Sequence, residues 1–158
     1  EVGCIGENYY EAILKSMLSV GHRIPKKNIL ISSGPTRSKV ELLNSTRMLI
    51  EKGYNIYSTA GTAKFFKENG IDTQILYWPD EDKEPNIMEY LHDRKIDLVI
   101  NIPKNHTKRE LDNGYKIRRA AVDYNIPLIT NARLSSAFIY AICKVDPTEI
   151  AIKSWDEY

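Results

Sequence analysis

The feature of this 158-residue chain that most limits its possible folds is a regular alternation of segments. Five short segments are typical of buried β-strands, and a stretch with helical spacing follows each of them. The clearest is Asp97 to Ile102, a nearly continuous apolar run of the kind expected for a central parallel strand covered on both faces. Strands that alternate with helices predict an α/β fold, a doubly wound, five-stranded parallel sheet with helices on both faces. The predicted strands are residues 28–33, 54–58, 73–77, 97–102 and 126–130.

The helices are predicted from apolar residues spaced three and four apart and from glycines that follow them. Ser38 is the expected N-cap of a helix that ends near Gly53. The other predicted helices are residues 11–20, 63–69, 85–93, 115–124 and 135–143. Residues 1–27 are then an N-terminal helix and linker, residues 28–143 the main domain, and residues 144–158 a polar tail that docks on the surface or is disordered.

The charges of the chain nearly cancel, with 22 basic and 21 acidic residues. A balanced charge favours neither nucleic acid nor a membrane surface as a partner, and no apolar run is long enough to span a bilayer. Cys4 and Cys143 belong to no metal-binding pattern, which favours two reduced, buried thiols in a cytoplasmic protein without a bound metal. Because the chain begins at Glu1 without a methionine, we expect it to be part of a longer protein.

A loop rich in small hydroxyl residues, Ser58-Thr59-Ala60-Gly61-Thr62, runs directly from a predicted strand into a helix. Backbone N–H groups and the helix dipole favour an anion there, and Gly61 lets the backbone approach it closely. Lys39 follows the preceding strand and is expected at the same sheet edge, where it can add a positive charge. The alternatives are that Thr59 or Thr62 only caps a helix and that Lys39 is only solvated.

Further candidates follow the third and fourth strands. Trp78 can stack on a ligand or cover the core, and Asn101 and Asn113 can bind a carbonyl or carboxylate or act as turn residues. Arg118 and Arg119 point about 100° apart on a helix, so that at most one faces the ligand edge and the other pairs with a carboxylate. No catalytic triad or metal-ligand spacing is present, and we therefore expect no catalytic residues and no cofactor.

These loops resemble those of a known family. The segments 59–62, 98–101, 114–123 and 126–131, taken in order, are similar to the methylglyoxal-synthase-like allosteric domain at the C-terminus of carbamoyl-phosphate synthetase large chains. The resemblance covers about residues 1–143 and implies a regulatory domain that binds an effector but performs no reaction. The parent enzyme it implies is a ligase of pyrimidine and arginine biosynthesis that uses ATP and a divalent metal.

The resemblance also implies roles for individual residues. In nucleotide-regulated members, positions matching Lys39, Thr59 and Thr62 hold the phosphate, with Asn101 nearby. In members activated by N-acetylglutamate, positions matching Thr59, Thr62, Trp78, Asn101 and Asn113 form the pocket. The predicted effector-binding residues are Lys39, Ser58, Thr59, Gly61, Thr62, Trp78, Asn101, Lys104, Asn113 and Arg118.

Two positions bear on the choice of effector. Lys104 stands where the acetylglutamate site has an asparagine, and Trp78 stands where the enterobacterial nucleotide site has a lysine, although animal pyrimidine-pathway members also carry tryptophan. Because both Lys39 and Lys104 are present, we favour a nucleotide or phosphoribosyl effector over N-acetylglutamate. The implied partners are UMP, UTP, IMP, phosphoribosyl pyrophosphate or N-acetylglutamate, the synthetase domains of the same chain and the small glutaminase chain.

Two other members of the same fold remain as alternatives. Methylglyoxal synthase eliminates phosphate from dihydroxyacetone phosphate with a carboxylate base, and Asp80 or Asp82 is the candidate base here. The synthase has a Gly-Gly-Asp, a second Asp and a Pro-His that this chain lacks. A fragment of a bifunctional purine-biosynthetic enzyme is the other alternative, and it fits the N-terminal segment less well.

Overall fold

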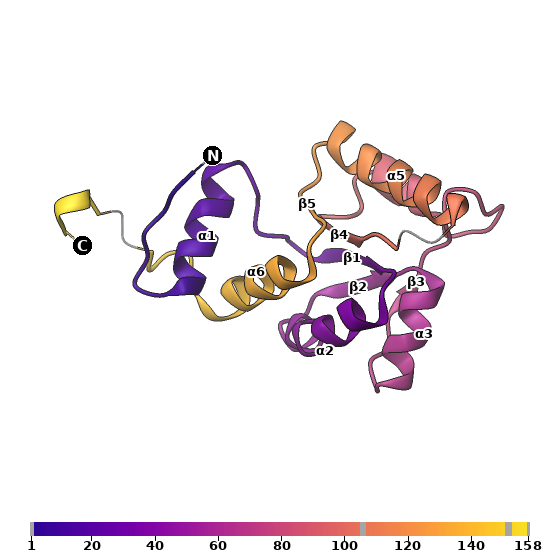
Figure 1. Cartoon of the computed structure of the whole chain (residues 1–158), viewed down its shortest axis with the longest axis horizontal. Helices are drawn as coiled ribbons and strands as arrows, with labels where there is room; N and C mark the ends of the chain where they lie inside the picture. Colours follow the sequence, from indigo (N-terminus) through magenta and orange to yellow (C-terminus); the bar gives the residue numbers. More distant parts are fainter. Residues whose placement is uncertain (1, 105–106, 151–152, 158) are drawn as a thin grey trace.

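In the computed structural model, which describes residues 2–104, 107–150 and 153–157, the five strands form one parallel sheet (Figure 1). The strand order is β3-β2-β1-β4-β5. Each crossover between neighbouring strands carries a helix, as the alternation in the sequence predicts. The strands are β1 Asn28–Ser33, β2 Asn55–Ser58, β3 Gln74–Ile75, β4 Leu98–Ile102 and β5 Leu128–Ile129.

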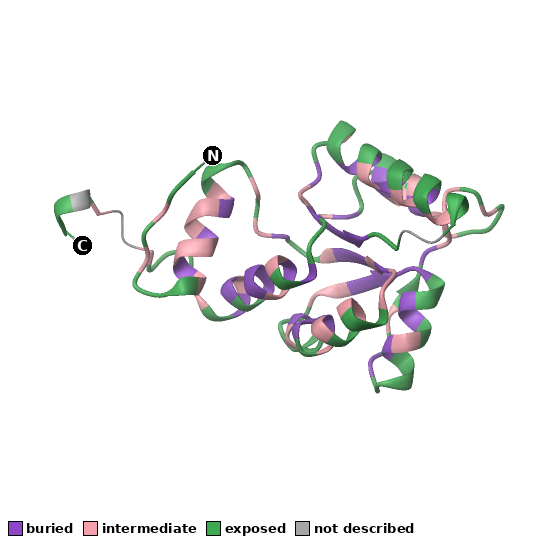
Figure 2. Ribbon diagram, in the orientation of Figure 1, coloured by how far each residue is buried: buried purple, intermediate pink, exposed green. Residues whose placement is uncertain are grey.

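Side chains of the central strands alternate between two hydrophobic cores. Ile29 and Ile31 of β1 belong to the larger core, whereas Leu30 between them belongs to the smaller one. Strand β4, which pairs on both sides, is buried over its whole length, in agreement with its apolar sequence. Figure 2 shows the buried residues concentrated along the sheet and on the helix faces turned toward it.

Helices cover both faces of the sheet. Helices α2, α3, α6 and α1 contribute to the larger core, whereas α4 and α5 contribute to the smaller one on the opposite face. In Figure 1, α5 lies on one side of β1 and β4, with α2 and α3 on the other. The helices are α1 Tyr9–Ser19, α2 Thr36–Glu51, α3 Ala60–Glu68, α4 Ile87–His92, α5 Lys108–Asp123 and α6 Ala132–Lys144.

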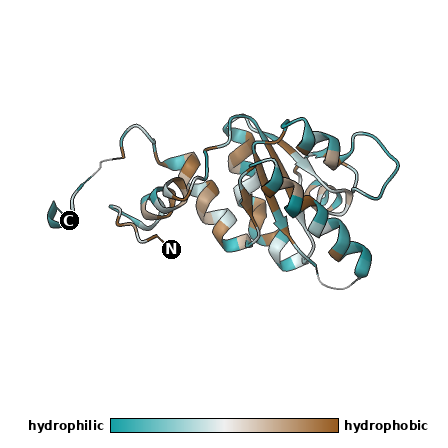
Figure 3. Cartoon of the chain, turned by 90° about the horizontal axis from the view of Figure 1, so that it is seen from above, coloured by the Kyte–Doolittle hydropathy of each residue, from teal (hydrophilic) through white to brown (hydrophobic). Residues whose placement is uncertain are grey.

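The predicted N-terminal helix packs on the domain itself. Leu14 and Met17 of α1 are buried in the larger core, and the ring of Tyr10 stacks on Tyr140 of α6 with 4.0 Å between centroids. The tail extends past α1, where Lys153 forms an ion pair with Glu7, and a short 3-10 helix follows at Trp155–Glu157. Figure 3 shows mainly hydrophobic strands between helices that carry both hydrophobic and hydrophilic residues. Part of the predicted tail, 151–152 and 158, lies outside the described residues.

Several predicted boundaries were wrong. Helix α2 begins at Thr36 after Pro35, so that Ser38 lies inside the helix and is not its N-cap. Helix α3 begins at Ala60, three residues before the predicted start. The predicted strands at both edges are shorter in the structure, because an edge strand pairs on one side only.

The largest error concerns α5, which begins at Lys108, seven residues earlier than predicted. Thr107 caps it by accepting a hydrogen bond from the backbone N–H of Glu110 at 3.2 Å. This Thr-x-x-Glu spacing is a known start signal, and it places Asn113, which was expected before the helix, inside it. Of the two free thiols, Cys143 is buried as predicted, whereas Cys4 is partly exposed, contrary to prediction.

Candidate functional site

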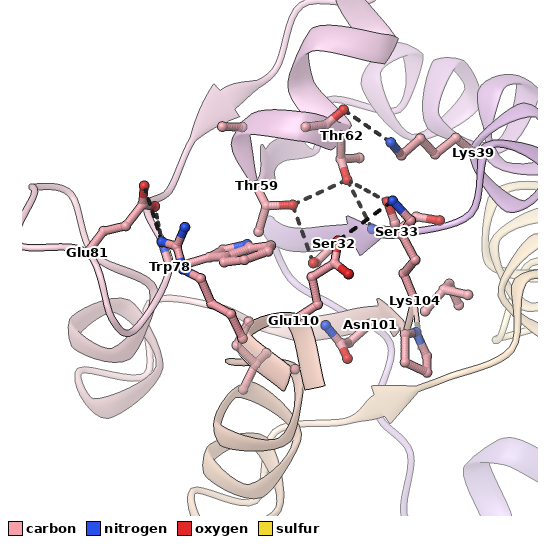
Figure 4. Close-up of a pocket in the computed structure, with 18 residues that line it drawn as sticks. Ser32, Ser33, Lys39, Thr59, Thr62, Trp78, Glu81, Asn101, Lys104 and Glu110 are labelled. Carbon is pink, nitrogen blue, oxygen red and sulfur yellow. Dashed lines mark hydrogen bonds and ion pairs between the residues drawn. The ribbon is translucent and has the colours of Figure 1, made fainter. Parts of the chain in front are cut away.

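A cavity of about 350 Å³ lies at the carboxyl ends of β1, β2 and β4 (Figure 4). Strands β1 and β4 end level with one another, since Ser33 pairs with Ile102, and β2 ends two residues earlier, where Ser58 pairs with Ile31. The loops that follow therefore meet at one edge of the sheet, which is the usual ligand position in open α/β folds. The lining residues are Ser32, Ser33, Gly34, Lys39, Thr59, Ala60, Gly61, Thr62, Trp78, Glu81, Asn101, Ile102, Pro103, Lys104, Arg109, Glu110, Gly114 and Ile117.

A network of hydroxyl groups fixes the floor of this cavity. The Thr62 hydroxyl accepts a hydrogen bond from the backbone N–H of Ser33 at 3.0 Å and lies 3.2 Å from the Ser33 carbonyl. It also lies 3.3 Å from the Thr59 hydroxyl, which is 3.3 Å from the Ser32 hydroxyl. Thr59 and Thr62 are almost fully buried. The network therefore joins the end of β1 to the start of α3.

Two helices whose first turns line the cavity, α2 and α3, have no capping side chain within the described part of the chain. Thr59 occupies the N-cap position of α3, but its hydroxyl makes no capping hydrogen bond, and Pro35 provides none to α2. By contrast, α1, α4, α5 and α6 each begin with a side chain that accepts a backbone N–H. The hypothesis that Thr59 or Thr62 only caps the helix is therefore wrong. The free N–H groups at the start of α3 are available to an anion.

Lys39 lies in the first turns of α2 and reaches across to α3. Its Nζ is 3.3 Å from the carbonyl oxygen of Gly61 and 5.8 Å from the ring centroid of Phe65. Burial lowers the pKa of Lys39 below its ordinary value, and the nearby charge of Lys104 lowers it further. An anion in the cavity would offset both effects, because it favours the charged ammonium group.

Lys104 lies on the opposite wall, in the loop after β4. Its ammonium group is 3.7 Å from the carboxylate of Glu110 on α5. The loop passes so close to β1 that a Cβ on Gly34 would lie 2.8 Å from the backbone nitrogen of Lys104. Gly34 is therefore required for this loop to reach the cavity.

Trp78 packs against the smaller core, which is one of its two predicted roles, and it also lines the cavity. The guanidinium of Arg109 lies 5.3 Å from the centroid of its ring. Arg109 also forms an ion pair with Asp80, with its Nε at 2.5 Å. The hydrogen bond from Arg109 lowers the pKa of Asp80 to about 2. Trp78 is thus held between the core and an arginine at the cavity rim.

Asn101 and Arg118 form a direct contact between β4 and α5. The Nη1 of Arg118 donates to the Oδ1 of Asn101 at 2.8 Å, and Asn101 is 3% exposed. The neighbouring Arg119 points to the outside of α5, where its Nε lies 2.9 Å from the carboxylate of Asp123. The prediction that one of the two arginines pairs with a carboxylate is confirmed for Arg119.

The cavity brings together most of the predicted site residues. Ser58, Asn113 and Arg118 do not line it: Ser58 is fully buried, and Asn113 lies under a neighbouring groove of α5. The lining residues that the sequence did not single out are Ser32, Ser33, Gly34, Ala60, Glu81, Ile102, Pro103, Arg109, Glu110, Gly114 and Ile117. The capping sequence at Thr107 would have indicated where Arg109 and Glu110 lie, because it fixes the start of α5.

Two negative findings apply to residues 2–104, 107–150 and 153–157. Within these ranges, no three His, Cys, Asp or Glu side chains gather closely enough to hold a metal ion. The helices in the same ranges are too short or too polar to cross a membrane.

Comparison with known proteins gives consistent results. A family model described as "MGS-like domain" matches residues 41–130. The chain is 44% identical over 162 residues to the multifunctional protein CAD of Squalus acanthias, covering 94% of this chain and 7% of that protein. It is 38% identical over 149 residues to the mitochondrial carbamoyl-phosphate synthase [ammonia] of Homo sapiens, covering 91% of this chain and 10% of that protein. The chain thus spans a tenth or less of either relative.

Among solved structures, a methylglyoxal synthase from Elizabethkingia anophelis aligns with a TM-score of 0.52 and 16% identity. The alignment covers 78% of this chain and 79% of that one. At this level of identity the likeness shows a shared fold alone.

Proposed function

The chain belongs to the MGS-like domain family, and on that premise we propose that it is the effector-binding regulatory domain of a carbamoyl-phosphate synthetase. The effector is a nucleotide or a phosphoribosyl compound, and its phosphate binds in the cavity between Lys39 and the start of α3. The relatives whose names include carbamoyl-phosphate synthase support the parent enzyme. The synthetase reaction, its ATP and metal, and its pyrimidine or arginine pathway then belong to other parts of that protein.

The observation that carries this proposal is the uncapped start of α3 beside Lys39. Apart from α2 and α3, each helix longer than six residues has a capping side chain among the described residues, including α5, whose first turn also lines the cavity. At α3 the backbone N–H groups, the hydroxyl of Thr59 and the ammonium of Lys39 face one small volume. Backbone donors, a helix dipole and a lysine together suit a phosphate group.

The charges around the cavity support an anionic effector whose charged group lies beside Lys39. Lys39, Lys104 and Arg109 face two carboxylates, Glu81 and Glu110. The carboxylates lie near Arg109 and Lys104, whereas Lys39 forms no ion pair within the described part of the chain. Lys39 is therefore the cation most available to a dianionic phosphate.

The surroundings of Asp80 argue against methylglyoxal synthase activity. An ion pair with Arg109 lowers its pKa to about 2, and a carboxylate held so far below neutrality is a weak general base. Asp80 also lies outside the lining of the cavity. Asp82, the second candidate base, is an exposed residue of the same turn.

Regulation in this proposal is a coupling between two binding events. An effector that prefers one arrangement of this domain against the synthetase domains shifts the whole enzyme toward it. A coupling free energy of about 1 to 3 kcal/mol is sufficient. The proposed partners are the synthetase domains of the same chain and the small glutaminase chain. The proposed location is the cytoplasm.

Calorimetric titration of this chain with UMP, UTP, IMP, phosphoribosyl pyrophosphate and N-acetylglutamate tests the proposal. We expect saturable binding of a nucleotide or phosphoribosyl compound that Lys39→Ala abolishes. The matched control is Lys64→Ala, which removes an exposed lysine on α3 outside the cavity. Binding of N-acetylglutamate alone, lost in Trp78→Ala, would contradict the choice of effector. If no compound binds, the regulatory proposal is wrong and methylglyoxal formation is the next assay.

A further inference from the structure

We propose that Arg118 and Gly114 of α5 act as positioning residues that hold Asn101 with its amide N–H groups turned into the cavity. This inference rests on the proposed function, because it names the chemical group that the effector presents to Asn101. That group is a hydrogen-bond acceptor, such as a phosphate or carbonyl oxygen.

The orientation of Asn101 follows from the chemistry of its partner. A guanidinium group has only hydrogen-bond donors, so the atom of Asn101 that faces Arg118 must be the oxygen. The contact of 2.8 Å is therefore between Nη1 and Oδ1. The amide nitrogen then points the other way, and Figure 4 shows it directed toward the space between Ser32 and Glu110. Within the described part of the chain, this nitrogen donates to no other group.

Gly114 provides the room that Arg118 needs. A Cβ at this position would lie 2.9 Å from Nη1 of Arg118 and 3.8 Å from Oδ1 of Asn101. Glycine is unfavourable inside a helix, and α5 carries this one near its middle. The close approach of the guanidinium gives a reason for a residue that otherwise weakens the helix.

The same geometry predicts what Gly114→Ala does. The nearest atom to the new Cβ is the end of a flexible side chain, which can move aside without disturbing the backbone. Alanine is also a better helix residue than glycine. We therefore expect Gly114→Ala to keep or raise the melting temperature while it displaces Arg118 from Asn101.

Binding and NMR measurements on the same variants test the inference. We expect Arg118→Met and Gly114→Ala each to weaken UMP binding about tenfold, as loss of a charged hydrogen bond does. The double variant should bind no more weakly than Arg118→Met alone, because both changes act on one contact. Arg119→Met is the matched control, since that arginine pairs with Asp123 on the outer face. Fully additive losses in the double variant would overturn the inference.

The NMR arm does not depend on a ligand. The side-chain amide signals of Asn101 are identified by their absence in the ¹⁵N spectrum of Asn101→Asp. They should shift in Arg118→Met and Gly114→Ala but not in Arg119→Met. If they stay unchanged in the first two variants, the positioning role is refuted even when UMP binds. If wild-type protein binds no effector but the signals shift as expected, the proposed function fails and the orientation of Asn101 stands.

Discussion

Replacement of Thr62 by valine tests the connection between β1 and α3. Beyond the last residue of β2, the backbone N–H of Ser33 has no strand partner on that side of β1, and the Thr62 hydroxyl accepts it instead at 3.0 Å. Thr62 is 1% exposed, so water cannot replace the hydroxyl in Thr62→Val. Valine has nearly the same shape, and the change therefore leaves a buried donor unpaired without opening a cavity.

An unpaired buried donor destabilises a protein by about 1 to 3 kcal/mol. For a chain of this size, each kcal/mol lowers the melting temperature by about 2 to 4 °C. The matched control is Thr46→Val in α2, where the buried hydroxyl donates at 2.7 Å to the carbonyl of Leu42. The Leu42 carbonyl lies inside a helix and also accepts a backbone N–H, so it stays paired in Thr46→Val. We therefore expect a smaller loss of stability in Thr46→Val than in Thr62→Val.

Thermal and urea unfolding of the two variants decide the question. We expect Thr62→Val to be less stable than Thr46→Val, with the difference in the free energy of unfolding inside the range above. Equal stability of the two variants would refute the argument that Thr62 substitutes for a missing strand partner.

Three further predictions concern the core and the cavity. Phe138→Ala removes a fully buried ring of α6 and should lower the free energy of unfolding by about 3 to 5 kcal/mol in urea titrations. Lys39 is charged below its pKa, which is lower than the ordinary 10.5, so affinity for a phosphate-containing effector should be highest there and fall as the pH rises through that pKa. An affinity that calorimetry finds constant from about pH 7 to 10 would contradict this. Arg109→Met should raise the pKa of Asp80 from about 2 toward 3.8, and an NMR titration in which the pKa stayed near 2 would show that another group holds it low.

Local sequence patterns accounted for the order of elements and the fold class. Runs such as Leu98 to Ile102 can be stable only when both faces are covered, and the intervening segments carry helical spacing. The position of the cavity also followed, because parallel strands place their carboxyl ends at one edge. Lys39, Thr59 and Trp78 are therefore expected together from the sequence, and all three line the cavity.

Boundaries were predicted less well wherever one local signal opposed another. Asn113-Gly114 has the composition of a turn, yet it lies within α5 because Thr107 starts the helix earlier and Ile117 and Ala121 bury its inner face. Tertiary packing outweighs the weak preference of two residues. The same limit applies to the edges of the sheet, where a strand extends only as far as its neighbour.

By itself the sequence determined the α/β alternation, the sheet edge that forms a site and the residues that could meet there. Only the tertiary structure decided which side chains face the cavity: Ser58 turns into the protein, Arg118 binds Asn101, and Glu81 and Glu110 join the wall. The physical reason is that strand and helix periodicities are local properties, whereas the direction of a side chain at an element end depends on contacts between segments far apart in the sequence.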